Sequence, residues 1–414
     1  MPDTLKQQLI AWRRDFHRYP EQGFLEIRTA SRIAAELARL GYRLRLGREV
    51  MSEAAIMGKP DAATTATHAA WARAHGAEPA WFDALKDGYT AVVADWDSGK
   101  PGPTTVLRVD MDALPIHESD AAEHRPQALG FRSQNPGSMH ACGHDGHSAI
   151  GLAVATLIAE NRAALRGKIR LIFQPAEEGV RGGKSLVAAG VVDDADYFIA
   201  LHLGLGVPQR HFVAGAGGFL ASSKLDATYR GVAAHAGGAP QDGKNALLAA
   251  ASAALSLHAI PRHSAGASRI NVGELHAGSG RNIIADHATL KLETRGANAT
   301  VNDYLEAEAR RIIAGAAQMY DVRAEIRLAG QAIDCRPSPA LAAQLARLAA
   351  DSPHFDHVQT EDHSARGGEA TYCLIGCELA AGHHHARFDI NEDALLAAAD
   401  ILYRAIQHLN RSQP

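Results

Sequence analysis

The order of the predicted strands and helices between residues 218 and 330 constrains the fold more than any other feature of this sequence. Short β-rich runs predict strands, and longer apolar stretches at helical spacing predict helices. The predicted elements are a strand at 225–231, a helix at 245–258, strands at 269–275 and 288–294, a helix at 301–319 and a strand at 323–328. This β-α-β-β-α-β order is typical of a ferredoxin-like α+β domain.

The sequence on both sides of this segment predicts a different architecture. Strands at 104–110, 169–173 and 198–203 alternate with a helix at 147–161, which is the pattern of an α/β domain. We therefore predict an α/β fold with a mixed, mostly parallel sheet between helices. This main domain comprises residues 1–217 and 331–414, and residues 218–330 are inserted into it. A chain of 414 residues is long enough for two domains.

Further elements of the main domain are predicted from the same signals. Strands at 89–97 and 104–110, with the turn 99–103 between them, have the pattern of a hairpin. The other predicted elements are a helical region at 12–40 that ends before Gly41, a helical insertion at 48–88, a helix at 338–350, a strand at 370–376 and a closing helix at 389–409.

Composition excludes several classes of function. The chain has 42 basic and 46 acidic residues, and this net charge of -4 gives no electrostatic footprint for nucleic acid or for an anionic membrane. No apolar stretch approaches the roughly 18 residues of a spanning helix, and the polar residues 1–18 contain no core of a secretory signal. We therefore expect a cytoplasmic protein whose four cysteines stay reduced.

Residue types that bind metals occur at the ends of several predicted strands and in one histidine cluster. They are Cys142 with His144, Glu177 with Glu178, His202, and the run His383, His384 and His385. Each has an ordinary structural explanation when taken alone, such as a small buried thiol or a solvated pair of glutamates. Together, thiolate, imidazole and carboxylate form a ligand set suited to zinc or a similar divalent ion.

Two carboxylate pairs add acid–base chemistry to this set. Asp110 and Asp112 occupy alternate positions of an extended segment, so both project from one face, where one could orient a ligating histidine. The alternative is that they only end the strand. Of the adjacent Glu177 and Glu178, one could hold a metal while the other takes the proton of a water.

Three motifs carry a family resemblance. They are His140-Ala-Cys-Gly-His-Asp-Gly-His147, Gln174-Pro-Ala-Glu-Glu-Gly179, and Ala234-His-Ala-Gly237 continuing to Gly243-Lys-Asn-Ala246. They resemble the aminoacylase and glutamate carboxypeptidase superfamily of dinuclear metallohydrolases, in the branch that hydrolyses N-acyl amino acids. The likeness spans nearly the whole chain and implies a metal-dependent amidohydrolase.

The resemblance implies a site with two divalent ions, zinc or manganese. Its implied ligands are Cys142 between the ions, His144 and His202 on one ion, and Glu178 and His384 on the other. Glu177 would be the general base and Asp112 the orienting aspartate. His384 is preferred because it stands four residues before Phe388, with His383 and His385 as alternatives. Residues 360–368 are shorter than the matching stretch of the branch, so Glu361 and Asp362 receive no catalytic role.

The resemblance also implies roles for the inserted domain as a dimerisation and lid domain. His235 would reach across a homodimer to polarise the scissile carbonyl, and Asn282 and Arg295 would hold the carboxylate of the substrate. Arg269 and Arg281 are alternatives for the second task. A related second subunit is a further expected partner.

The wider resemblance favours an amide between an aromatic acyl group and glutamate as the substrate. Two other interpretations stay open: a general aminoacylase or hippurate-type hydrolase, and a catalytically silent metal-binding partner subunit. The complete ligand set favours an active enzyme.

Overall fold

The computed structural model describes residues 2–362 and 373–411, and these divide into two compact units. The first unit contains the described residues up to Gly217 and those from Arg336 onward. The second unit is the continuous segment Gly218–Cys335. Each unit has its own hydrophobic core, so each is described by itself.

The first unit is built on an eight-stranded mixed sheet with the order β1-β2-β4-β3-β5-β12-β6-β11. Its strands are β1 (Arg43–Leu46), β2 (Val92–Asp97), β3 (Thr104–Asp110), β4 (Lys168–Gln174), β5 (Tyr197–Leu203), β6 (His211–Ala216), β11 (His357–Asp362) and β12 (Cys373–Ile375). The neighbours β4, β3, β5 and β12 run parallel to one another, whereas β2 and β6 are antiparallel to their neighbours β4 and β12. The predicted α/β class with a mostly parallel sheet is confirmed.

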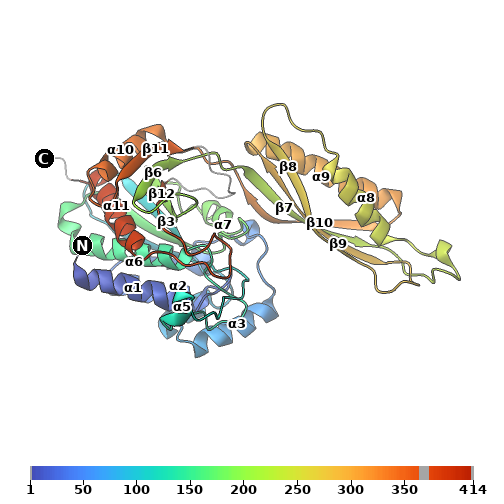
Figure 1. Cartoon of the computed structure of the whole chain (residues 1–414), viewed down its shortest axis with the longest axis horizontal. Helices are drawn as coiled ribbons and strands as arrows, with labels where there is room; N and C mark the ends of the chain where they lie inside the picture. The colour runs from blue at the N-terminus through green and yellow to red at the C-terminus, as the bar shows by residue number, and fades with distance from the viewer. Residues whose placement is uncertain (1, 363–372, 412–414) are drawn as a thin grey trace. The chain divides into compact units, whose positions relative to one another are not determined.

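Helix α6 (His144–Glu160) is the central helix of the first unit (Figure 1). It packs on β3, β4 and β5, while α1 (Asp3–Arg18) and α11 (Asp393–Leu409) pack against it. Because the sheet, α1 and α11 all contact it, α6 is buried almost along its whole length. It begins at His144, three residues earlier than predicted, so the histidine-rich motif forms its first turn.

The remaining helices of the first unit surround this core. They are α2 (Ile27–Arg39), α3 (Ala62–Ala74), α4 (Pro79–Leu85), α5 (Arg125–Ala128), α7 (Gly183–Ala188), α10 (Pro339–Ala350) and the 3-10 turns Gly47–Glu49, Glu53–Ala55 and Arg162–Ala164. The opening helical region thus consists of two helices, α1 and α2, and the insertion at 48–88 is helical as predicted. Among the described residues, no helix is both long and apolar enough to pass through a lipid bilayer.

The predicted hairpin of β2 and β3 is wrong. Strand β4 lies between them, antiparallel to β2 and parallel to β3. The reason is that β4 arrives after the crossover through α6 and pairs with both strands, which a short connection alone cannot reveal. Of the strand predicted at 370–376, β12 covers 373–375, and residues 370–372 lie outside the described part of the chain.

The second unit has the predicted β-α-β-β-α-β order. Its elements are β7 (Ala221–Arg230), α8 (Ala246–His258), β8 (Ser268–Ala277), β9 (His287–Gly296), α9 (Ala299–Met319) and β10 (Arg323–Ala332), with a 3-10 turn at Pro240–Asp242. The four strands form an antiparallel sheet in the order β10-β7-β9-β8. Residues of β7 and β9 alternate between buried and more exposed because α8 and α9 cover only one face.

Candidate metal centre

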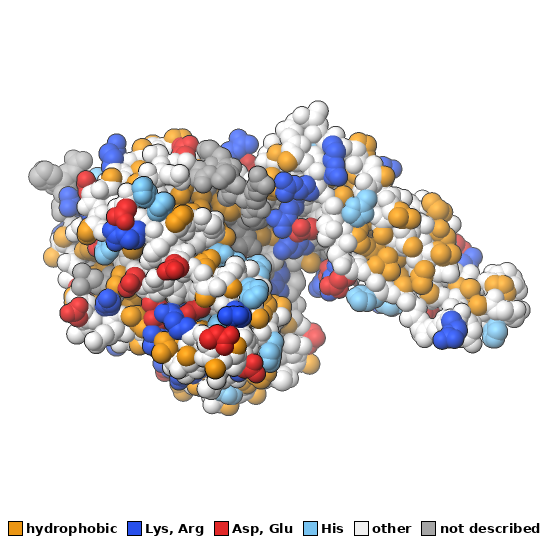
Figure 2. Space-filling model, viewed as in Figure 1, with side chains coloured by type: hydrophobic (Ala, Val, Ile, Leu, Met, Phe, Trp, Pro, Cys, Tyr) orange, Lys and Arg blue, Asp and Glu red, His pale blue; other side chains and the backbone are white. Residues whose placement is uncertain are grey.

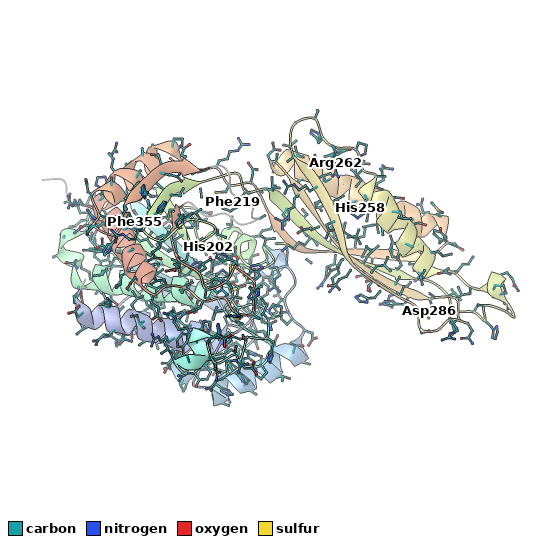
Figure 3. The ribbon with its side chains drawn as sticks, in the orientation of Figure 1. His202, Phe219, His258, Arg262, Asp286 and Phe355 are labelled. Carbon is teal, nitrogen blue, oxygen red and sulfur yellow. The ribbon has the colours of Figure 1, made fainter. Side chains whose placement is uncertain are left out.

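Three parallel strands bring the predicted ligands to one edge of the sheet. The carboxyl ends of β3, β4 and β5 lead to Asp112, to the pair Glu177 and Glu178, and to His202. The ends of parallel strands meet at the same edge, which is where α/β proteins collect functional side chains. His202 is seen inside the first unit in Figure 3.

Cys142 belongs to two groups of metal-ligand atoms. Cys142, His144 and His202 form one group, and Cys142, Glu178 and His384 form the other; in each group the ligand atoms lie within 4.8 Å of one another. The sulfur of Cys142 is 3.4 Å from Nε2 of His202. Nε2 of His384 is 3.4 Å from Oε1 of Glu178. This arrangement has the form of two adjoining sites that share one thiol.

His144 presents a single ring nitrogen to the centre. Its Nδ1 donates to the main-chain carbonyl oxygen of Asp112 at 2.9 Å and lies 3.3 Å from a carboxylate oxygen of the same residue. Nε2 therefore faces the ligand group, and it is buried without a hydrogen-bond partner among the described residues. A hydrogen bond that orients the other nitrogen is the usual support of a metal-bound histidine.

The protonation of the two histidines differs. Burial lowers the pKa of His144, but the hydrogen bond to Asp112 and the charges of Asp110, Asp112 and Glu178 outweigh it and raise that pKa to about 10. Burial, followed by the neighbouring histidines, lowers the pKa of His202 well below its usual value. The raised pKa of His144 reflects the negative charge of the surrounding carboxylates, which also favours a bound cation. The lowered pKa of His202 leaves a neutral imidazole that can bind a cation.

Asp112 fixes the turn that carries the two glutamates. Its carboxylate accepts from the main-chain N–H groups of Glu177 at 3.0 Å and of Glu178 at 2.9 Å. Oε2 of Glu177 lies 3.8 Å from Nε2 of His144. Asp112 therefore orients both a histidine and the glutamate pair, which is more than the sequence predicted for it.

Of the three neighbouring histidines, the structure brings His384 to Glu178. Its backbone has a φ of 62° and its N–H donates to the carbonyl oxygen of Ala141 at 2.8 Å. The side chain is 53% exposed, so it lies at the rim of the centre. His383 instead places its Nε2 3.2 Å from the carbonyl oxygen of Leu203, and His385 is exposed.

Asp110 and His147 lie behind the ligand groups. Nε2 of His147 accepts from the main-chain N–H of Leu203 at 3.1 Å, and its Nδ1 lies 3.5 Å from a carboxylate oxygen of Asp110. Ligand atoms of these two residues and of His144 also fall within 4.8 Å of one another. Because the carboxylate of Asp110 is already paired with Arg108 at 2.5 Å, this group is the weaker candidate for a metal.

A buried ion network beside the centre was not predicted. Arg13 on α1 pairs with Asp145, the residue after His144, at 2.8 Å, and with Asp389, which follows Phe388, at 2.6 Å. His17 lies between Asp145 at 2.8 Å and Glu118 at 2.9 Å. The network ties the start of α6 to the segment after His384. Its members are far apart in the sequence, so no local pattern of residues reveals that they meet.

Glu26 is a second supporting residue that the sequence analysis missed. It is fully buried, and its carboxylate accepts from the main-chain N–H of Ala176 at 2.8 Å and from the hydroxyl of Thr90 at 2.6 Å. Burial and the charge of Asp112 raise the pKa of Glu26 to about 8. Glu26 and Asp112 therefore hold the same turn. Glu26 binds the main chain of Ala176, and Asp112 binds the main chain of the two glutamates that follow.

His235 lies in the second unit and has a defined tautomer. Its Nδ1 accepts from the main-chain N–H groups of Gly237 at 3.1 Å and Gly238 at 3.0 Å. Nε2 must then carry the proton of the neutral ring, which makes it a donor on an exposed side chain. Asn282 is close by, since its main-chain carbonyl oxygen accepts a hydrogen bond from the main-chain N–H of Ala236 at 3.0 Å.

Arg295 is not near Asn282 within one chain. Asn282 precedes the first residue of β9, His287, whereas Arg295 lies near the end of that strand. The stretch of β9 from His287 to Arg295 is by itself roughly 27 Å long at about 3.4 Å per residue. The two residues predicted to hold one carboxylate are therefore not brought together by a single chain.

The donor set fits divalent cations. It combines a thiol, imidazoles and carboxylates that converge on two adjoining positions. The buried Nε2 of His144 has no hydrogen-bond partner among the described residues, and leaving such an atom unsatisfied is costly. The site can therefore hold two metal ions and the groups that move a proton beside them.

Comparison with known proteins places the chain in a family. The profile of Peptidase family M20/M25/M40 matches residues 106–408. The chain belongs to this family and is a metal-dependent amidohydrolase.

Two relatives of known name cover nearly the full length. The indole-3-acetyl-aspartic acid hydrolase of Enterobacter agglomerans is 48% identical, over 96% of this chain and 95% of its own. One of the subunits of the p-aminobenzoyl-glutamate hydrolase of Escherichia coli (strain K12) is also 48% identical, over 97% of this chain and 96% of its own. The branch that the motifs predict, with hydrolases of N-acyl amino acids, is confirmed.

A solved structure agrees with these relatives. The crystal structure of the aminobenzoyl-glutamate utilization protein from Klebsiella pneumoniae superimposes with a TM-score of 0.82 at 43% identity. The match covers 98% of this chain and 97% of that one. The likeness therefore extends over both units rather than over the metal centre alone.

Proposed function

We propose that this protein hydrolyses p-aminobenzoyl-glutamate to p-aminobenzoate and glutamate. The observation that carries the proposal is the pair of adjoining ligand groups sharing Cys142, with Glu177 beside them. The names of the E. coli and Klebsiella relatives favour this substrate. The equal identity to an indole-3-acetyl-aspartic acid hydrolase supports the wider class, an aromatic acyl group joined to an acidic amino acid.

The proposed ligands are those that the family resemblance implies. Cys142 is shared, His144 and His202 serve one ion, and Glu178 and His384 serve the other. Zinc and manganese both suit this mixture of sulfur, nitrogen and oxygen donors. When bound, the ions activate a water and polarise the amide carbonyl.

Residues of the chain itself manage the proton and the developing charge. Glu177 accepts the proton of the attacking water and returns it to the leaving amine. Asp112 holds Glu177 in place through its main-chain N–H. His235 offers the proton on Nε2 to the oxygen that becomes negative in the transition state. Asn282 and Arg295 bind the substrate from two different places on the second unit.

We also propose a homodimer through the second unit. Strand β8 is at the end of its sheet, where its unpaired edge can add a strand from another copy. Leu248 and Leu255 of α8 are 45% and 78% exposed and lie two turns apart on one face. Figure 2 shows hydrophobic side chains gathered over this part of the second unit. In such a dimer the partner's His235 and Asn282 would serve the metal centre of the other chain.

A cytoplasmic location and a related second subunit complete the proposal. The location agrees with the four free cysteines, because a reducing compartment preserves thiols. The second subunit is supported by the name of the E. coli relative, which designates one component of a hydrolase.

A substrate panel tests the proposed function. Purified protein loaded with zinc or manganese is assayed with p-aminobenzoyl-glutamate, indole-3-acetyl-aspartate and hippurate. We expect the highest kcat/KM for the glutamate conjugate. Preference for hippurate would support the general aminoacylase instead. Activity only in the presence of a second, related chain would support the interpretation of this protein as a catalytically silent partner subunit.

A further inference from the structure

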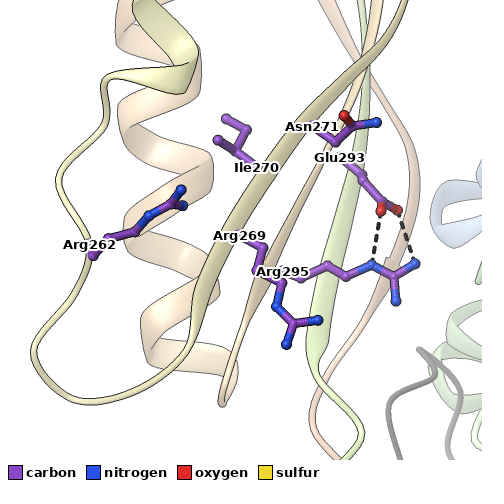
Figure 4. A pocket seen from close by; sticks show the side chains of 6 residues that line it. All are labelled: Arg262, Arg269, Ile270, Asn271, Glu293 and Arg295. Carbon is purple, nitrogen blue, oxygen red and sulfur yellow. Dashed lines mark hydrogen bonds and ion pairs between the residues drawn. The ribbon is translucent and has the colours of Figure 1, made fainter.

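The second unit contains a basic pocket beside its edge strand β8. The cavity has a volume of about 470 Å³, and all its lining residues belong to this unit (Figure 4). They are Arg262, Arg269, Ile270, Asn271, Glu293 and Arg295. Arg269 and Asn271 come from β8, Glu293 and Arg295 from β9, and Arg262 from the loop before β8.

The pocket has a surplus of positive charge. Three guanidinium groups and one carboxylate line it, which leaves a local excess of two positive charges (three minus one). Glu293 is bound to Arg295 through both oxygens, at 2.9 and 3.2 Å. Arg262 donates to the main-chain carbonyl oxygen of Ser268 at 2.8 Å. Within the described part of the chain the guanidinium of Arg269 makes no hydrogen bond or ion pair, so it can bind a ligand.

Arg269 and Arg295 oppose each other in the sheet. They are direct cross-strand partners in the register of β8 and β9. Like charges in this position repel and destabilise the strand pair. The arrangement therefore costs stability by itself, and a bound anion would relieve that cost.

We propose that this pocket binds both carboxylates of an acidic amino acid, the part of the substrate that leaves as the amine. The inference rests on the proposed function and adds the residue that reads the second carboxylate. Arg295 binds the α-carboxylate, and Arg269 binds the side-chain carboxylate. The planar guanidinium of Arg269 suits this task because it can donate two parallel hydrogen bonds to one carboxylate. In Arg295, Glu293 engages Nε and Nη2, and Nη1 remains for the α-carboxylate. The proposal explains why two arginines stand side by side in the cavity.

The test compares two conjugates that differ only in the second charge. p-Aminobenzoyl-glutamate and p-aminobenzoyl-glutamine have the same size, but the latter carries a neutral amide at the end of its side chain. We expect Arg269→Met to lower kcat/KM for the glutamate conjugate about tenfold to a hundredfold, the effect of losing a hydrogen bond to a charged group. The glutamine conjugate should change little, and Arg269→Lys should recover part of the loss.

Arg311→Met is the matched control. Arg311 lies on α9, on the covered side of the sheet, and is 70% exposed in a pair with Glu308. This variant should leave the ratio of the two kcat/KM values unchanged. An equal loss on both conjugates in Arg269→Met, or no loss on either, would overturn the proposal.

A binding measurement separates this inference from the proposed function. Calorimetric titration with glutarate, a dicarboxylate, and with butyrate, a monocarboxylate, requires no hydrolysis. We expect glutarate to bind more tightly to the unaltered protein and to lose that advantage in Arg269→Met. If the protein cleaves neither conjugate but shows this pattern, the proposed function fails and the pocket stands. If glutarate and butyrate bind alike, the pocket assignment fails whatever the hydrolysis shows.

Discussion

The sulfur of Cys142 lies 3.4 Å from Nε2 of His202, although 60 positions separate the two residues in the chain. Cys142 ends the turn before α6, and His202 lies in β5. The contact exists because α6 starts at the edge where the parallel strands end. It places a thiol against a neutral imidazole in a buried position, which is the geometry of a ligand pair.

Replacement of Cys142 should remove metal from both positions, because the thiol belongs to both ligand groups. We expect Cys142→Ala to lose most of its bound metal and at least about a hundredfold in kcat/KM, because losing even a residue that only orients a metal ligand costs about 10- to 100-fold. Elemental analysis of the purified variant measures the loss. Cys335→Ala is the control, because burial raises the pKa of that thiol to about 11 and it belongs to no ligand group among the described residues. Normal metal content in Cys142→Ala would contradict the shared ligand.

Glu177→Gln should separate catalysis from metal binding. The amide keeps the size of the side chain but cannot accept a proton, so we expect kcat to fall by about 10²- to 10⁴-fold, the usual contribution of a general base. Metal content should remain near normal because Glu178, not Glu177, is the proposed ligand. Steady-state kinetics and elemental analysis of one preparation give both values. Turnover equal to that of the unaltered protein would refute the assignment.

His17 should make stability decline at alkaline pH. Burial lowers its pKa, but hydrogen bonds from the imidazolium to Asp145 and Glu118 outweigh burial and raise the pKa from 6.5 to about 9. A raised pKa means that the folded state holds the proton more tightly, so the contribution is complete below about pH 6.5 and disappears as the pH rises through about 9. Arg13 and the ring of His140 also face this group.

Denaturant unfolding of the chelated protein between pH 6 and 10 measures this effect. Chelation is needed because metal binding itself depends on pH. We expect the free energy of unfolding to fall by on the order of 3 kcal/mol across this range, as linkage predicts for such a shift. His17→Gln should be less stable at neutral pH and should show a flatter profile. An equally steep profile in that variant would assign the decline to another group.

Two inactive variants should restore activity when combined, if the partner's His235 serves each centre. A dimer of one His235→Ala chain and one Glu177→Ala chain contains one intact site and one doubly altered site. Random exchange should therefore recover about a quarter of the original activity, by the statistics of a two-fold dimer. Leu255→Glu should weaken the dimer in analytical ultracentrifugation and reduce this recovery. No recovery in a verified mixed dimer would place His235 outside the partner's site.

The sequence by itself determined the residue types of the metal centre and the order of the elements. Four ligands could be identified from local patterns: Cys142, His144, Glu178 and His202. Each follows or ends a β-rich run or lies in a motif of metal-binding residues, and such positions meet in an α/β fold. The β-α-β-β-α-β order of the second unit was likewise visible, because helical and strand periodicities are local properties of the chain.

Only the tertiary structure decided the contacts between distant segments. It placed β4 between β2 and β3, brought His384, which the resemblance had already favoured, to Glu178, and joined Arg13 to Asp145 and Asp389. It also set Arg269 opposite Arg295 in the sheet, whereas Asn282 lies before the other end of β9. The physical reason is that strand register and buried ion pairs depend on packing across the whole unit, which no local pattern of residues encodes.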